Sequence, residues 1–369
     1  MRRRALIGSL AGALATRGQE TKFGVRVQPG PMDEIRVKDY APESSLVVDE
    51  HHPAKARFPA IDVHTHTSMN NIRTPADVDA WVKTMDEVGV ERSIVFTGAT
   101  GAEFDRQAKL FGAHKSRLIP WCAIDMRGQE DAGWTQRAVR ELERCHKMGA
   151  RGAGELTDKG WGLQGSERGA LPRNRRLHLD HARLAPFWER CGELGLPVNI
   201  HIADHPSCWR PLGPHQERTP DFQHFNLSGK DVPGYEELLA TRDRAVAAHP
   251  KTIFVFCHLS NQANDLAKLA AFLDRHPNAH LDIAARDYEL GRQPRGSGKF
   301  IERYRARLLW GTDMGSDAAM YRGWWRLLET ADEYIPGRLW WRHYGLELPE
   351  ASLKALYRDN ALRLLNWEA

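Results

Sequence analysis

The chain has 369 residues, 41% of them hydrophobic, and a formal net charge of +4. This is enough apolar material for a sizeable core, and barrels of this length are routinely single domains. No run of Lys and Arg is interleaved with aromatic residues, so we expect no nucleic-acid partner. The five cysteines are dispersed without Cys-x-x-Cys spacing, which argues against a disulfide framework or a Cys-rich zinc site.

The first residues resemble an export signal. Arg2, Arg3 and Arg4 precede an apolar stretch at 5–15 that ends on small residues, as in a signal peptide, and the paired arginines resemble the twin-arginine type. We expect residues 1–18 to direct the protein to the periplasm or outside the cell. The alternative is an ordinary basic terminus and a cytoplasmic protein. The stretch is too short to span a membrane, which takes about 20 apolar residues.

Residues 19–57 are polar and irregular, and we expect them to be a lead-in segment. From residue 58 onward, apolar runs typical of strands alternate with helical stripes. These runs begin near Ile61, Ile94, Ile119, Gly152, Val198, Ile253, Leu281 and Leu308. Eight strand and helix units predict one α/β domain over 58–369, a (β/α)₈ TIM barrel with a closing C-terminal helix. The rival is an open doubly wound sheet, but no glycine-rich phosphate loop follows the first strand.

Two long segments, 157–180 and 203–233, follow the fourth and fifth predicted strands. Active sites of such barrels are built from the loops after the strands, so we expect these segments to determine specificity. Several tryptophans lie in loop-like contexts and are candidates for pocket walls, with packing as the alternative. They are Trp161, Trp209, Trp324 and Trp325.

The first predicted strand ends with two histidines. In the sequence Ile61-Asp-Val-His-Thr-His66, His64 and His66 are two residues apart, so both point to the same side of a strand. Imidazole is a ligand suited to zinc and similar metals. Two unrelated polar residues at a strand end would be the simpler interpretation of this pair alone.

Later strands end in the same kind of residue. His201 closes the fifth predicted strand, His258 the sixth and Asp313 the eighth. One such histidine is more often a core residue than a ligand, but packing does not explain this whole set at the carboxyl ends of barrel strands. The sequence therefore predicts a metal centre there.

The pattern of His64-x-His66, His201, His258 and Gly311-Thr-Asp313 resembles the amidohydrolase superfamily. The segments Pro59–His66 and Tyr357–Ala361 resemble its amidohydrolase-related branch. That branch includes decarboxylases related to aminocarboxymuconate-semialdehyde decarboxylase, lactone hydrolases and hydratases. The resemblance covers about residues 56–365. It implies one divalent metal, with Zn²⁺ favoured and Mn²⁺ or Fe²⁺ as alternatives.

The resemblance also implies roles for these residues. His64, His66 and His201 would be nitrogen ligands, and Asp313 an oxygen ligand that accepts a proton from bound water. A bound divalent ion lowers the pKa of water toward ~7. His258 would act as general acid/base or as an electrophile, or as a ligand if a second metal is bound.

Glu155 departs from the pattern of binuclear relatives, which often carry a carboxylated lysine on the fourth strand. Here that strand reads Arg151-Gly-Ala-Gly-Glu155. Glu155 could bridge a second metal, bind substrate or orient a ligand, and an arginine-paired structural role is also open. We expect one metal, with a second as the alternative.

Four further residues are candidates for substrate binding. Arg286, which follows the seventh predicted strand, and Arg210, on the long fifth loop, could each hold a substrate carboxylate. Trp209 and Trp161 are the candidate pocket walls on the two long loops. His205 is interpreted as pocket-lining.

These features favour a hydrolase that attacks an ester, lactone or amide bond of a small molecule. The alternative is a lyase, a decarboxylase or hydratase of a carboxylated substrate. An arginine pair at the mouth would favour the lyase, and an apolar pocket would favour a neutral substrate. A non-catalytic binding protein is the third hypothesis. A homodimer through the helices is a reasonable expectation.

Overall fold

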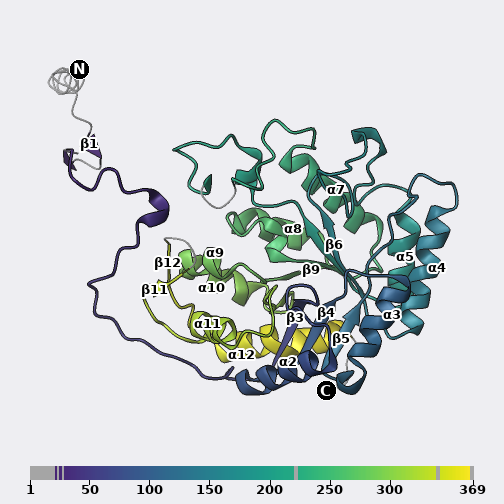
Figure 1. Ribbon diagram of the computed structural model, residues 1–369, viewed down its shortest axis with the longest axis horizontal. Coiled ribbons are helices and arrows are strands. Elements are labelled where there is room, and N and C mark those ends of the chain that lie inside the picture. The colour runs from purple at the N-terminus through teal and green to yellow at the C-terminus, as the bar shows by residue number, and fades with distance from the viewer. Residues whose placement is uncertain (1–20, 23–24, 27–28, 220–222, 338–340, 366–369) are drawn as a thin grey trace. The chain divides into compact units, whose positions relative to one another are not determined.

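The protein is described here by a computed structural model that covers residues 21–22, 25–26, 29–219, 223–337 and 341–365 (Figure 1). It divides into two compact units, Met1–Val47 and Val48–Ala369. In the first, β1 (Thr21–Lys22) pairs antiparallel with β2 (Val25–Arg26), and a turn of 3₁₀ helix covers Val37–Asp39. The predicted export signal at 1–18 lies outside the described residues.

The second unit is built on eight parallel strands. They are β3 (Ala60–His66), β4 (Val90–Phe96), β5 (Leu118–Trp121), β6 (Ala153–Asp158), β7 (Val198–Ile202), β8 (Phe254–Phe256), β9 (Ala279–Asp282) and β10 (Leu308–Leu309). Hydrogen bonds order them as β3-β4-β5 and β6-β7-β8-β9-β10. A parallel bridge between Cys122 and Ala153 joins these sheets on one side. On the other, the amide of Val63 donates to the carbonyl of Trp310 at 3.1 Å, so the barrel is closed.

Helices follow the strands in turn and lie outside them (Figure 1). They are α2 (Pro75–Val88), α3 (Gly101–Leu110), α4 (Trp134–Lys147), α5 (Ala185–Glu193), α7 (Tyr235–Ala248), α8 (Leu266–Arg275), α9 (Asp287–Arg292), α10 (Pro294–Arg303) and α11 (Ala318–Glu329). A short antiparallel pair, β11 (Ile335–Pro336) and β12 (Arg342–His343), follows α11. The chain ends with α12 (Glu350–Lys354), a π-helical turn (Ala355–Asp359) and α13 (Asn360–Leu364). The predicted (β/α)₈ barrel is therefore confirmed.

Helix α2 shows how the sequence defines these elements. Thr74 caps its first turn: its side chain accepts a hydrogen bond from the amide of Asp77, whose carboxylate accepts one from the amide of Thr74. This reciprocal arrangement satisfies two amides that the helix leaves unpaired. Gly89 ends the helix with φ of 88°, a left-handed conformation that glycine adopts at little cost. The buried face of the helix is formed by Val78, Trp81, Val82, Met85 and Val88.

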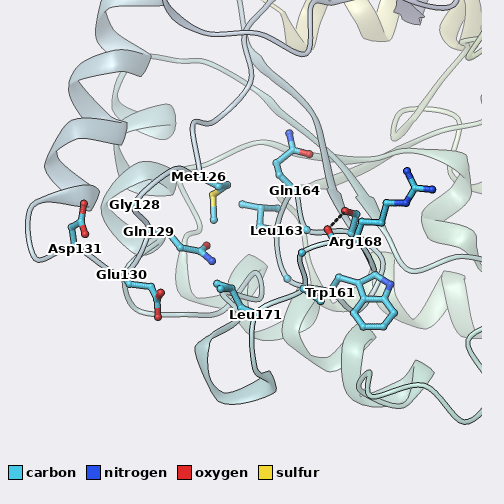
Figure 2. Close-up of a pocket in the computed structure, with 15 residues that line it drawn as sticks. Met126, Gly128, Gln129, Glu130, Asp131, Trp161, Leu163, Gln164, Arg168 and Leu171 are labelled. Atoms are coloured by element: carbon cyan, nitrogen blue, oxygen red, sulfur yellow. Dashed lines mark hydrogen bonds between the residues drawn. The ribbon is translucent and has the colours of Figure 1, made fainter.

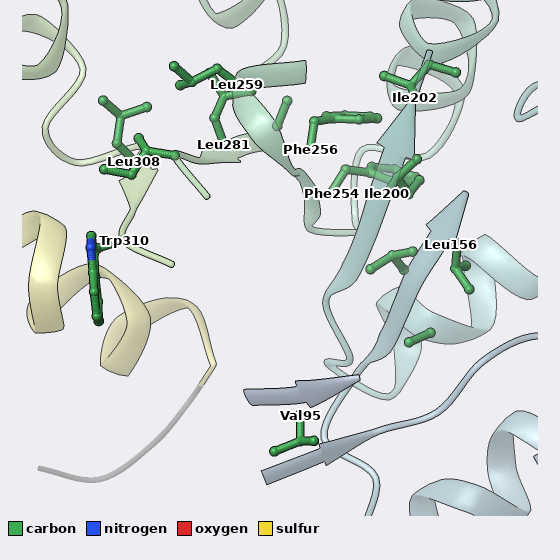
Figure 3. Close-up of a cluster of buried hydrophobic side chains, with 14 of the residues drawn as sticks. Val95, Leu156, Ile200, Ile202, Phe254, Phe256, Leu259, Leu281, Leu308 and Trp310 are labelled. Carbon is green, nitrogen blue, oxygen red and sulfur yellow. The ribbon is translucent and has the colours of Figure 1, made fainter. Parts of the chain in front are cut away.

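Alternate residues of the strands contribute to two separate apolar clusters. Val95, Phe254, Phe256 and Leu308 belong to the larger cluster, which also contains buried residues of the surrounding helices (Figure 3). Residues next to these on the strands form a smaller cluster together with the C-terminal helix; its members are Ile61, Val63, Ile94, Phe96, Ile119, Trp121, Val255, Leu309, Ala361, Leu364 and Leu365. The C-terminal helix thus fills the barrel interior on one side.

The stretch just before β3 is anchored to the barrel unit. The amide of Arg57 donates to Glu329 Oε1 at 2.9 Å, the amide of His51 donates to Asp332 Oδ2 at 2.8 Å, and the amide of Ala56 donates to the carbonyl of Val88. The division therefore falls before Val48, earlier than the boundary at 57/58 expected from composition, because backbone hydrogen bonds of an irregular segment leave no pattern in the sequence.

Three other expectations concern tryptophans, cysteines and membrane helices. Trp324 and Trp325 were expected in loops, but both are buried in α11; their spacing fits the inner face of that helix. All five cysteines are free and buried. Among the described residues, no helix has the length and apolar character needed to cross a membrane.

Candidate metal centre

The polar residues predicted at the strand ends lie together at the carboxyl ends of β3, β6, β7, β8 and β10. Several residues here adopt left-handed backbone conformations: φ is 57° at Ala203, 57° at His258, 51° at Ala285 and 68° at Asp313. Such conformations are costly for residues other than glycine and cluster at functional sites. In each case the chain turns sharply where it leaves the strand.

Three of the predicted ligands form a first donor group. His64 Nε2 and His66 Nε2 lie 3.2 Å apart, and Asp313 Oδ1 lies 3.3 Å from the first and 3.2 Å from the second. In a tetrahedral site with metal–ligand bonds of about 2.0–2.1 Å, ligand atoms lie about 3.3 Å apart. These three atoms therefore have the spacing of three ligands around one tetrahedral metal ion.

A second donor group consists of Glu155, His201, Cys257 and His258. Glu155 Oε1 lies 2.8 Å from His201 Nδ1, 3.4 Å from His258 Nε2 and 3.2 Å from the sulfur of Cys257. His201, expected to complete the first group, thus lies with the second. Cys257 is a donor that we did not predict, because in the sequence it lies at the end of an apolar run, far from any other cysteine.

Glu155 connects the two groups. While Oε1 faces His201, Cys257 and His258, its other oxygen, Oε2, lies 3.4 Å from His66 Nε2. Oε1 also lies 3.9 Å from His64 Nε2, so the Glu155 carboxylate contacts members of both donor groups. Glu155, for which the sequence left several roles open, therefore contacts histidines. The arginine-paired structural role is not the one that these contacts describe.

The histidine hydrogen bonds fit a metal. His64 Nδ1 lies 3.0 Å from Asp282 Oδ2, His258 Nδ1 lies 2.8 Å from the carbonyl of Ala284, and His201 Nε2 lies 3.1 Å from Asp204 Oδ1. When each acceptor takes a ring N–H outside the cluster, the other nitrogen of a neutral ring can present its lone pair to a metal. Without a metal, the inner nitrogens of His201 and His258 can instead donate to Glu155. Metal-binding histidines almost always have such a partner. The residues therefore fit a divalent cation.

Charge in this site is balanced between carboxylates and imidazoles. Burial opposes ionisation of Glu155, but hydrogen bonds from His201 and His258 outweigh it and hold the pKa of Glu155 well below its usual range. Burial likewise opposes ionisation of Asp313, yet hydrogen bonds from His64 and His66 lower its pKa. Both carboxylates are therefore ionised at neutral pH, and their negative charge attracts a cation.

Two carboxylates that the sequence analysis missed support the ligands. Asp282 is fully buried and also accepts hydrogen bonds from Asn199 Nδ2 and the amide of His258. Asp204 is paired with Lys159 Nζ at 3.0 Å. Asp282 ends β9 within an apolar run. A charged residue inside such a run was the feature of the sequence that could have identified it.

A cavity of about 470 Å³ opens beside Asp313. Most of its wall is apolar, from Met314, Met320, Trp324, Leu327, Ile335 and Pro336. Asp287 and Asp317 also line it. Because it reaches a member of the first donor group, it can hold a substrate within reach of the site.

None of the four predicted substrate residues lines this cavity. Arg286 is largely buried and donates to the carbonyls of His258 and Ala285 and to Asn261. The indole of Trp209 donates to the carbonyl of Pro233. Exposed Arg210 lines a separate hollow of about 510 Å³ together with His205.

Trp161 lines another pocket, of about 360 Å³, between residues 126–131 and 161–171 (Figure 2). The guanidinium of Arg176 lies 5.0 Å from the centre of its indole ring. The two tryptophans on the long loops therefore do not share one pocket.

Comparisons with solved structures show the same fold at low identity. An uncharacterised TIM-barrel protein from Bordetella bronchiseptica is 16% identical, with TM-score 0.52, covering 84% of this chain and 99% of that one. 2,6-Dihydroxybenzoate decarboxylase from Rhizobium is 17% identical, with TM-score 0.51, covering 85% and 100%. 5-Carboxyvanillate decarboxylase from Novosphingobium aromaticivorans, solved with manganese, is 12% identical, with TM-score 0.50, covering 86% and 100%.

A search of curated proteins found no match. The amidohydrolase family model matches residues 49–367, nearly the whole barrel unit. This match confirms the resemblance drawn from the strand-end histidines. The chain belongs to the amidohydrolase family, whose members are metal-dependent enzymes.

Proposed function

We propose that this enzyme is a metal-dependent hydrolase that cleaves an ester, lactone or amide bond in a small neutral molecule. The observation that carries the proposal is the cavity beside Asp313. Its wall is mainly apolar, and the carboxylates that line it among the described residues are Asp287, Asp313 and Asp317. A neutral substrate would bury apolar surface against this wall.

The donor set defines the chemistry. His64, His66 and Asp313 would hold a divalent ion, with Glu155 completing the site. When bound, such an ion acts as a Lewis acid and lowers the pKa of water toward ~7. Zinc is the metal that imidazole and carboxylate donors at this spacing favour, with manganese or iron as alternatives.

Proton movement falls to Asp313 and His258. Asp313 Oδ2 lies 3.9 Å from His258 Nε2, so both groups face one space. Asp313 is ionised and accepts a proton from the attacking water. Burial lowers the pKa of His258, and its Nδ1 lies 2.8 Å from the Ala284 carbonyl. Nε2, which lies 3.4 Å from Glu155 Oε1, would then be the nitrogen that carries a proton toward the leaving group.

The alternative is a lyase acting on a carboxylated substrate. In a lyase the metal itself would hold the carboxylate, and an arginine at the mouth would add to its hold. Arg286, the arginine predicted for that role, has hydrogen bonds to protein groups on each of its three nitrogens. Exposed Arg210 lines a different hollow from the cavity beside Asp313. Hydrolysis of a neutral substrate is therefore our leading proposal, with the lyase as the alternative.

The test is a substrate panel of neutral lactones and aryl esters beside carboxylated aromatics, with acid release and carbon dioxide release measured separately. We expect hydrolysis of neutral substrates, reduced about 10²–10⁴-fold by Asp313→Asn. Asp86→Asn, an exposed change on α2, is the control and should retain activity. Carbon dioxide release without any hydrolysis would establish the lyase instead.

A further inference from the structure

A hollow of about 510 Å³ lies on the long segment that follows β7. Its polar wall includes His205, Ser207, Arg210 and His215. None of the residues that line it also lines the cavity beside Asp313. The hollow is therefore a separate place in the molecule, and the metal chemistry described above does not account for it.

Arg210 is fixed at its backbone and unpaired at its guanidinium. Its carbonyl lies 3.3 Å from Gln216 Nε2 and 2.8 Å from Asn226 Nδ2, and Gln216 Nε2 also lies 3.1 Å from the carbonyl of Ser207. Within the described part of the chain, the guanidinium itself has neither an ion pair nor a hydrogen bond. A wall that is fixed before any ligand arrives is typical of binding sites.

Three other arginines near the hollow share two glutamates among the described residues. The ion pairs are Arg218–Glu289 at 3.0 Å, Arg286–Glu289 at 3.4 Å and Arg292–Glu217 at 2.9 Å. Glu217 itself lines the hollow. With Arg210, these described residues carry four positive charges and two negative charges. An anion in the hollow would reduce this excess of positive charge.

The ring of His205 lies within the field of these arginines. Burial lowers the pKa of His205, and the charges of the four arginines lower it further, to about 3. The ring is therefore neutral at pH 7. Its Nδ1 accepts a hydrogen bond from the amide of Ser207 at 3.2 Å, so the ring proton is on Nε2, which lies 3.8 Å from Glu289 Oε1. The positive potential that keeps a second proton off this ring favours a bound anion.

We propose that this hollow binds a small oxyanion, with a phosphate or a carboxylate group, and that Arg210 provides its principal contact. A guanidinium presents parallel N–H groups that match two oxygens of such an anion. His215 and Ser207 lie in the same wall, and their side chains can add hydrogen bonds. The inference goes beyond the proposed function and does not depend on it.

Side chains lie between this hollow and the metal centre. His205 faces Glu289, and Glu289 contacts Arg286. Arg286 Nε in turn donates to the carbonyl of His258. An anion held by Arg210 would therefore lie outside the two donor groups, and its binding should not require a metal.

The experiment is isothermal titration calorimetry of the full-length protein with sodium sulfate and, separately, with sodium acetate, at pH 7 and constant ionic strength. Sulfate stands for phosphate groups and acetate for carboxylates, so the anion that binds more tightly identifies the ligand class. We expect one saturable site per chain for at least one of them. Arg210→Gln should weaken that binding at least about tenfold, because charge-assisted hydrogen bonds are lost.

Two controls make the result specific. Arg168 is also exposed and without an ion pair within the described residues, and it lines the other pocket, of about 360 Å³. Arg168→Gln should therefore bind the anion as the wild-type protein does. Binding should also persist after metal is removed by chelation and dialysis. Equal weakening by both arginine variants, loss of binding with the metal, or no saturable binding of either anion would each overturn the proposal and leave the proposed function intact.

Discussion

Each of His64, His201 and His258 has one ring nitrogen directed at the other donors and one directed at an acceptor outside them. For His64 the acceptor is Asp282, at 3.0 Å from Nδ1. Burial opposes ionisation of Asp282, but the charge of His64 and its hydrogen bond lower the pKa of Asp282. An ionised acceptor holds the proton on Nδ1 and leaves Nε2 for the metal.

We predict that Asp282→Asn lowers metal affinity about 10–100-fold. In the wild-type protein, Asp282 Oδ1 accepts hydrogen bonds from the amides of His258 and Ala284. The side-chain oxygen of asparagine can accept the same two bonds, but its NH₂ group would face His64 Nδ1. The ring would then favour the wrong tautomer. Competition with a chromophoric chelator measures the affinity. Asp274→Asn, on the exposed end of α8, is the control, and equal affinity in both variants would contradict this role.

Much of the candidate site could be predicted because carboxyl ends of barrel strands meet at one face. His64, His66, His258 and Asp313 each follow an apolar run, so their position is visible in the sequence. The partners of these residues come from other strands. Nothing near Asp204 or Cys257 in the sequence shows that they face His201 and Glu155, and only strand order and register bring them together.

The positions of the residues in the first donor group depend on the contact between β10 and β3. Gly311 follows β10, and a Cβ atom built there would lie 2.8 Å from Cβ of His64 and 3.1 Å from its amide nitrogen. Only glycine allows the two chains to approach so closely. The predicted Gly-Thr-Asp ending of the last strand thus has a packing role as well as a catalytic one.

Gly311→Ala is expected to cost about 1–3 kcal/mol of folding free energy through overpacking and to weaken metal binding by displacing His64. Denaturant unfolding and metal titration check the two effects. Gly298→Ala, in α10, has no atom within 4 Å of the added Cβ. It should instead stabilise the protein by about 0.5–1 kcal/mol. An unchanged Gly311→Ala protein would show that the barrel tolerates the methyl group.

The loop after α11 holds the segment that precedes β3. Asp332 accepts hydrogen bonds from the amide of His51 and from Arg326 Nε. Burial opposes ionisation of Asp332, but these bonds outweigh it and lower its pKa to about 2. This attachment was not predictable, because His51 and Asp332 are far apart in the sequence.

The pKa of Asp332 gives a pH dependence of stability. An unfolded aspartate has a pKa near 3.9, so ionised Asp332 stabilises the fold fully above about pH 4, and this contribution is lost as the pH falls toward 2. Asp332→Asn should lower the free energy of unfolding by about 1–2 kcal/mol at pH 7 and by less at pH 3. Exposed Glu333→Gln is the control. A difference that does not depend on pH would refute the assignment.

At the scale of the whole molecule, the barrel brings five strand ends into one buried cluster of acids and histidines. Without a metal, this arrangement buries the ionised carboxylates of Glu155, Asp282 and Asp313 among imidazoles, and buried charge is costly. A bound cation would compensate this negative charge and link the strands. The fold class could be predicted from the alternation of strand and helix patterns. The cavity and the position of Glu155 between the donor groups could not, because both depend on how the strands are arranged in the closed barrel.

Metal removal should therefore lower the thermal stability of the intact protein. Free metal at 100 times its dissociation constant stabilises a folded state by about 2.7 kcal/mol. Calorimetry with and without a chelator should show a lower melting temperature after depletion, restored by zinc. His64→Ala/His66→Ala should respond less to zinc, and an unchanged wild-type melting temperature would argue against metal linkage.

The most direct test of the metal centre is elemental analysis of purified protein beside the His64→Ala/His66→Ala variant. We predict at least one divalent ion per wild-type chain, with a second if Glu155 bridges both donor groups, and loss of the first ion in the variant. Retention of the same metal content in the variant would place the metal elsewhere. Absence of metal from both proteins, even after reconstitution, would contradict the account.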